Sequence, residues 1–123
     1  MRIGSEESFL RLEKVGREGP AVVWEVTAAI HGAGCIAAVH GLTKVRTTDG
    51  DLDRMDDFAA HQARQFELKL SQGGWLRIRR DPKGRTLVNY RLGHLRKGAA
   101  LEGKVRLEGE SAKAFCRELE ELL

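Results

Sequence analysis

Hydrophobic and polar residues alternate through most of residues 65–93, the most regular stretch of the chain. Its apolar positions are Phe66, Leu68, Leu70, Leu76, Ile78, Val88, Tyr90 and Leu92. A period of two places such residues on one face of a strand and the intervening polar residues on the other. Gly73-Gly74 and Asp81-Pro82-Lys83-Gly84 have the composition of turns. This stretch therefore predicts three strands joined by two turns, with one buried sheet face.

In the rest of the chain, hydrophobic residues recur with the period of a strand in some segments and with the period of a helix in others. We predict strands over residues 8–15, 21–31, 35–42 and 101–108, a helix over residues 51–64, and a final helix that opens at residues 109–111. Asp49 to Asp51 are expected to cap the first helix, because carboxylates suit the positive end of the helix dipole. Turns as short as Gly32-Ala33-Gly34 favour antiparallel pairing.

These elements predict one α+β domain over residues 1–123. We expect an antiparallel β-meander of about six to seven strands, with one inserted helix and one C-terminal helix on one face. No internal repeat is visible in the sequence. The predicted core residues are Trp24, Phe66, Leu68, Ile78, Tyr90, Phe115 and Leu119.

Composition narrows the class of protein. Of 123 residues, 41% are hydrophobic and 32% charged, which is typical of a globular domain. No apolar run approaches the roughly 20 residues that span a bilayer, and the first residues lack the apolar segment of a secretory signal. We therefore expect a cytoplasmic protein without membrane contact, in which Cys35 and Cys116 are reduced core thiols.

Positive charge is concentrated in one part of the chain. The formal net charge is +3. Residues 77–97 hold eight arginines and lysines against one carboxylate, Asp81, so this segment carries +7 and the remaining residues carry −4. Such an asymmetry predicts a basic surface and an anionic partner.

Catalytic and metal-binding motifs find little support. Asp49, Asp51 and Asp53 resemble the start of a calcium loop, but Arg54 and Ala60 occupy the positions that need glycine and glutamate. His31, Cys35 and His40 match no zinc-ligand spacing. We expect no metal, no cofactor and no enzymatic activity.

One enzymatic alternative stays open. An active site assembled only in three dimensions from Glu25, His40 and His61 would leave no motif in the sequence.

The polar face of the predicted strands is the main candidate site. The candidate partner-binding residues are Trp75, Arg77, Arg79, Arg85, Asn89 and Arg91. Arginine and tryptophan are favoured anchors in protein interfaces. A strand surface with arginines beside an aromatic side chain also suits single-stranded nucleic acid. A third interpretation is an ordinary solvated face whose arginine stems cover apolar surface. The sequence does not determine the oligomeric state, although an uncovered sheet edge would allow a dimer.

The spacing of hydrophobic residues also resembles a known family. The segments that carry the resemblance are Trp24, Gly34-Cys35-Ile36, Leu52 and Phe58, Phe66 to Leu70, Trp75 to Ile78, Gly84 to Val88, Val105 to Leu107, and Phe115 to Leu122. Over about residues 20–123 this layout is similar to small bacterial immunity proteins of the WapI-associated type and to related bacterial domains.

The resemblance implies a non-enzymatic protein that binds and neutralises a cognate bacterial toxin. No functional residue can be carried over from the family, because no diagnostic binding motif is available to match. Toxins of such systems are often basic nucleases whose antidotes tend to be acidic, and the basic character of this chain, with a pI near 9.1, departs from that pattern. The basic chain would still suit an antidote if the toxin were acidic, or if binding used the acidic helix near Asp53, Asp56 and Asp57.

Overall fold

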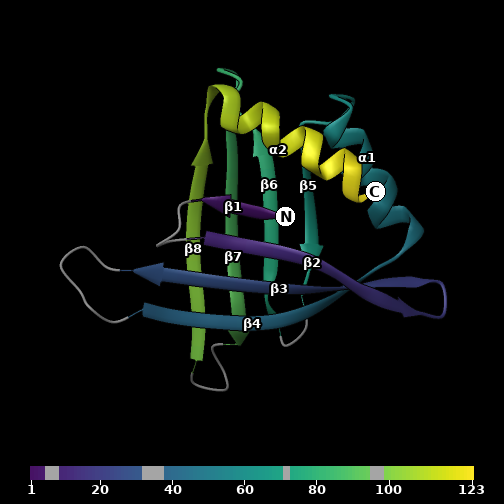
Figure 1. Cartoon of the computed structure of the whole chain (residues 1–123), viewed down its shortest axis with the longest axis vertical. Helices are drawn as coiled ribbons and strands as arrows, with labels where there is room; N and C mark the ends of the chain where they lie inside the picture. The colour runs from purple at the N-terminus through teal and green to yellow at the C-terminus, as the bar shows by residue number, and fades with distance from the viewer. Residues whose placement is uncertain (5–8, 32–37, 71–72, 95–98) are drawn as a thin grey trace.

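The structure, a computed structural model, describes residues 1–4, 9–31, 38–70, 73–94 and 99–123 (Figure 1). Its elements are β1 (Arg2–Gly4), β2 (Phe9–Glu18), β3 (Ala21–His31), β4 (Ala38–Thr47), α1 (Asp49–Ala59), β5 (Gln65–Lys69), β6 (Trp75–Arg80), β7 (Thr86–His94), β8 (Ala99–Leu107) and α2 (Gly109–Leu122).

The eight described strands form two antiparallel sheets, ordered β1-β2-β3-β4 and β5-β6-β7-β8. The α+β class is confirmed, but the prediction of one meander of six to seven strands was wrong. Helix α1 separates β4 from β5, so the chain starts a second sheet instead of extending the first. The three-residue β1 is too short to show a hydrophobic period. The order ββββα thus occurs twice, although the sequence shows no repeat.

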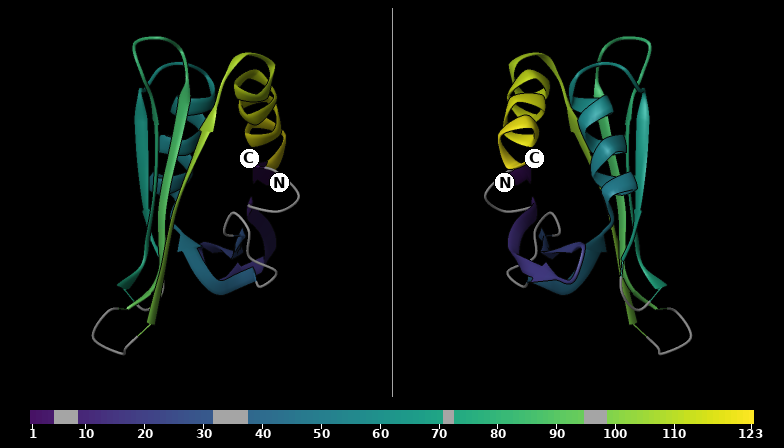
Figure 2. Two further views of the ribbon diagram at one scale, coloured as in Figure 1. Left: turned by 90° about the vertical axis from the view of Figure 1, so that its left-hand side faces the viewer. Right: turned by 90° about the vertical axis from the view of Figure 1, so that its right-hand side faces the viewer.

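The two sheets and the helices form layers around one core. Both helices and the first sheet lie on the same side of the second sheet, whose opposite face is left bare (Figure 2). The strands of the first sheet run across those of the second (Figure 1). One buried cluster includes residues from both sheets and both helices, among them Val26, Leu76, Phe58 and Phe115. All seven predicted core residues are buried, which confirms the predicted facing of the strands.

Two buried hydrogen bonds connect β3 to β4 in the core. The indole Nε1–H of Trp24 donates to Oγ1 of Thr47 at 2.8 Å, and the Thr47 hydroxyl donates to the carbonyl of Val22 at 3.1 Å. A buried polar group must be satisfied within the protein. Thr43 and Thr47 are both buried on β4, and this strand continues to Thr47, beyond the predicted end at residue 42.

Several boundaries differ from the predictions. Strand β2 runs to Glu18, and its pairing with β3 shifts between Lys14 and Gly16 at a bulge. The predicted turn over residues 32–34 and the first residues of the predicted strand 35–42, including Cys35, lie outside the described residues.

Helix α1 begins at Asp49 and ends at Ala59, where we expected residues 51–64. The N-cap is Thr48, and Asp51 completes a capping box: the Thr48 hydroxyl accepts from the Asp51 amide, and the Asp51 carboxylate accepts from the Thr48 amide at 2.9 Å. The helix ends early because His61 adopts a left-handed conformation, with φ of 61°. Helix α2 begins at Gly109, as predicted. Within the described residues, neither helix has the length and apolar character needed to cross a bilayer.

Candidate functional site

The bare face of the second sheet carries most of the predicted site residues. We call it the basic face and define it by three rows of register partners across β5, β6, β7 and β8: Lys69, Trp75, Arg91 and Glu102; Glu67, Arg77, Asn89 and Lys104; Gln65, Arg79, Leu87 and Arg106. Six cations against two carboxylates give this face a net charge of +4. Because no described element covers it (Figure 2), all of this charge faces solvent or a partner.

Trp75 contacts two arginines at one end of the basic face. The guanidinium carbon of Arg77 lies 4.0 Å from the centre of the indole ring, and that of Arg91 lies 5.7 Å from it. The Nε–H of Arg77 donates to Oε2 of Glu67 at 3.0 Å, and Arg91 donates to Glu102. Cation–π contacts and cross-strand ion pairs of this kind each contribute about 1 kcal/mol or less at exposed positions. Together they orient the aromatic ring and neutralise two of the cations.

The remaining positive charge of the basic face lies beside this stack. Among the described residues, no ion pair involves Lys69, Arg79 or Lys104, whereas Arg106 pairs with Glu108 at 3.1 Å. Sequence reasoning included Arg79 but missed Lys69 and Lys104 as site residues. The strand alternation predicts that Lys69 and Lys104 point outward. Only the pairing of β5 and β8 with the central strands places them beside Trp75 and Asn89.

Two hollows lie on this face. One of about 500 Å³ is lined by Arg77, Arg79 and Asn89, by residues of β5 and by Arg54 of α1, so it reaches the β5 edge of the sheet. The other, of about 440 Å³, is lined by Trp75, Asn89 and Lys104. Arg77 and Asn89, which are register partners, border both hollows and so lie between them. Hollows flanked by an aromatic ring and cations can receive the side chains of a docked protein.

Arg85 does not belong to the basic face. It lies in the turn between β6 and β7, where its Nε–H donates to Oδ2 of Asp81 at 2.6 Å. Oδ1 of Asp81 accepts from the amides of Lys83 and Arg85, each at 2.9 Å. Desolvation would raise the pKa of Asp81, but the amide and guanidinium of Arg85 outweigh it and hold that pKa below its ordinary value. Arg85 therefore stabilises the turn, and five of the six predicted residues share the face.

The other candidate chemistries are not assembled by the described residues. Within that part of the chain, no three His, Cys, Asp or Glu side chains lie close enough to hold a metal ion. Asp51 of the calcium-like stretch is engaged in the helix cap. Glu25 lies on β3 opposite Glu13 and Lys44, while His61 follows α1, so these two members of the proposed three-dimensional active site belong to different regions.

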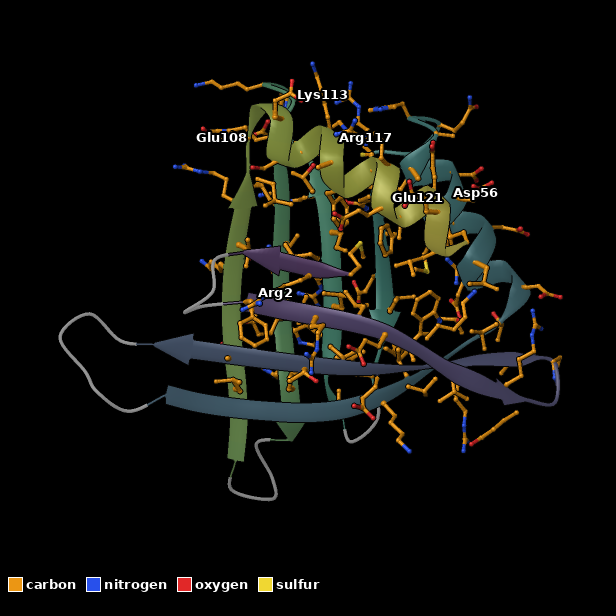
Figure 3. The ribbon with its side chains drawn as sticks, viewed as in Figure 1. Arg2, Asp56, Glu108, Lys113, Arg117 and Glu121 are labelled. Atoms are coloured by element: carbon orange, nitrogen blue, oxygen red, sulfur yellow. The ribbon has the colours of Figure 1, made fainter. Side chains whose placement is uncertain are left out.

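Charge is distributed asymmetrically across the molecule. Helix α1 carries five aspartates and one arginine, and α2 carries four glutamates against one lysine and one arginine, so the two helices sum to −6. Asp56 and Glu121 belong to this acidic layer (Figure 3). The helices and the basic face lie on opposite sides of the second sheet (Figure 2), so a charged partner would approach the molecule in a preferred orientation.

In comparisons with models of known protein families, with curated proteins and with solved structures, nothing matches this chain significantly. The likeness to WapI-associated immunity proteins therefore remains a prediction from the sequence.

Proposed function

We propose that this protein is a non-enzymatic binding module that docks an acidic protein surface on its basic face. The observation that carries the proposal is the combination, on one uncovered sheet face, of a net charge of +4 with a held indole ring at Trp75. Protein interfaces favour tryptophan and arginine as central anchors, and the surrounding charge guides association.

The state of Trp75 favours a protein over single-stranded nucleic acid. A base that stacks on an aromatic side chain needs its open face. One face of this indole is covered by Arg77 at 4.0 Å, and the ring is only partly exposed. The carboxylates of Glu67 and Glu102 also stand at the two edges of the face, where they repel a phosphate chain. A protein partner can instead pair with both signs of charge.

The resemblance described above suggests the identity of the partner. A bacterial toxin with an acidic binding surface would suit the basic face, and binding there would make this protein its neutralising antidote. A toxin encoded by an adjacent gene is the first partner to test.

The test is co-purification with a tagged bait in three forms. The first is the parent, and the second is the Arg79→Glu/Lys104→Glu variant, which reverses two cations that have no ion pair among the described residues. The third is an Arg17→Glu/Arg46→Glu control, which makes the same charge change on the first sheet and also breaks the exposed Arg46–Glu18 ion pair, a loss that costs little stability. We expect one acidic protein to bind the parent and the control but not the face variant. Calorimetry with that purified protein should show affinity that falls as salt rises from about 50 to 200 mM, because salt screens exposed charges.

Two results would overturn the proposal. One is a partner that binds the face variant as tightly as the parent. The other comes from fluorescence anisotropy with labelled single-stranded oligonucleotides. It is that an oligonucleotide binds the parent at low salt but does not bind the face variant, while no co-purified protein depends on that face. That second result would establish the nucleic-acid alternative.

A further inference from the structure

A separate cavity of about 750 Å³ opens on the other side of the second sheet, at the end where the two helices meet the turn between β6 and β7. Its walls come from the residues that follow α1, from the end of β6 and its turn, and from one face of α2. Small side chains leave this space: Ala59 on α1 and Ala112 and Cys116 on α2 line it. The volume lies within the range of small-molecule sites.

The inner wall of this cavity contains a cation without a carboxylate partner among the described residues. Arg80 is half-buried, and its guanidinium donates to the carbonyl of Phe58 at 3.1 Å and to that of Ala63 at 3.4 Å. It also lies 3.5 Å from Sγ of Cys116 and 4.4 Å from the centre of the Phe58 ring. Charges removed from water are usually paired, and a guanidinium has five N–H donors. An anion in the cavity would supply the missing counter-charge.

Three further cations line the same cavity from two elements. Lys83 comes from the turn after β6, and Lys113 and Arg117 lie one helical turn apart on α2 (Figure 3). These two are the only cations of α2, and both lie on its cavity face, although the helices as a whole are acidic. Lys113 is also 3.6 Å from Glu110, in a highly exposed pair that contributes little. With Glu120 as the one carboxylate of the lining, the cavity carries a net charge of +3.

We propose that this cavity binds a small organic anion, with an acidic group such as a phosphate or carboxylate and an apolar body. The acidic group contacts Lys113, Arg117 and Lys83, and Arg80 supplies positive potential from the inner wall. The apolar body packs on Ala59, Ala112 and Cys116. This site is independent of the basic face, because the two lie on opposite sides of the second sheet.

The test is a titration of the uniformly labelled protein with phenyl phosphate, followed by amide chemical shifts. We expect saturable shifts at Gly84, Gly109 and Ala112, with a Kd in the millimolar range or tighter, and no comparable shifts at Arg79 or Asn89 of the basic face. Benzyl alcohol, a neutral molecule with a similar apolar body, should bind at least about tenfold more weakly, since charge-assisted hydrogen bonds supply that difference. Benzoate replaces the phosphate with a carboxylate and distinguishes the two acidic groups.

Matched variants separate the cavity from general attraction of anions. The Lys113→Glu/Arg117→Glu variant should raise the Kd for phenyl phosphate by about tenfold or more. Lys69→Glu/Lys104→Glu makes the same charge change on the basic face and should leave the Kd within about twofold, because surface charges beyond a Debye length are screened. Equal weakening by both variants, equal binding of benzyl alcohol, or shifts spread over both faces would overturn the proposal.

Discussion

Replacing Thr47 with valine tests whether the buried hydrogen bonds beneath the second sheet stabilise the fold. Valine keeps the shape and the β-branching of threonine, so strand propensity hardly changes. The substitution removes the acceptor of the Trp24 indole N–H and the donor to the Val22 carbonyl. Thr47 is fully buried and Trp24 is 1% exposed, so water cannot replace the lost partner.

The expected cost follows from the two bonds. Each intramolecular hydrogen bond contributes about 1 kcal/mol, and an unsatisfied buried donor costs about 1–3 kcal/mol. The added methyl group returns about 0.8 kcal/mol of apolar burial. The net loss is therefore about 2 kcal/mol in the free energy of unfolding. For a domain of this size, that loss lowers Tm by about 8 °C.

The assay is urea unfolding followed by tryptophan fluorescence, with calorimetric melting as a second measurement. Thr27→Val is the control, because Thr27 is only partly buried on the other face of β3 and should tolerate valine. In a Trp24→Phe background, Thr47→Val should cost about 1 kcal/mol less, since the indole donor is already gone. A Thr47→Val variant that unfolds like the parent, or a cycle with no coupling, would refute the reasoning.

Three further predictions concern the core. A Cβ atom at Gly103 would clash with Oη of the buried Tyr90, so Gly103→Ala should lower the free energy of unfolding in urea by about 1–3 kcal/mol, whereas Gly16→Ala, with no atom within 4 Å of its Cβ, should change stability little. Burial raises the pKa of Tyr90, the one tyrosine of the chain, so its contribution to stability is present below a pH of about 10 and is lost as pH rises through the folded pKa. Tyrosinate absorbance should therefore appear at a higher pH in the folded protein than in the chain unfolded by urea, and Tyr90→Phe should flatten the alkaline limb of stability. Leu119→Asp should abolish the cooperative melting transition, because an unpaired buried carboxylate costs several kcal/mol against a typical total of about 5–15 kcal/mol, while the adjacent Glu118→Asp should melt nearly like the parent.

Local patterns in the sequence determined which residues face inward and which elements form. Alternation placed Leu76, Ile78 and Tyr90 in the core and Arg77 and Arg79 outside, because side chains of a strand point alternately to its two faces. The helical spacing of Phe115 and Leu119 likewise identified the buried face of α2. These features depend on neighbours along the chain, so one sequence is enough to predict them.

The division into two sheets, the composition of the basic face and the cavity at the helix ends were decided by tertiary structure. Whether β4 pairs with β5 depends on where α1 packs, and the hydrophobic alternation of the strands is the same for one continuous sheet as for two sheets. Arg85 has the outward parity of its strand, but Asp81 holds it in the turn. Lys69 and Lys104 lie far apart in sequence and meet the Trp75 stack only through strand pairing. Arg80, Lys83, Lys113 and Arg117 converge only because the end of β6 and α2 pack together around small side chains, and no pattern of neighbouring residues encodes that contact.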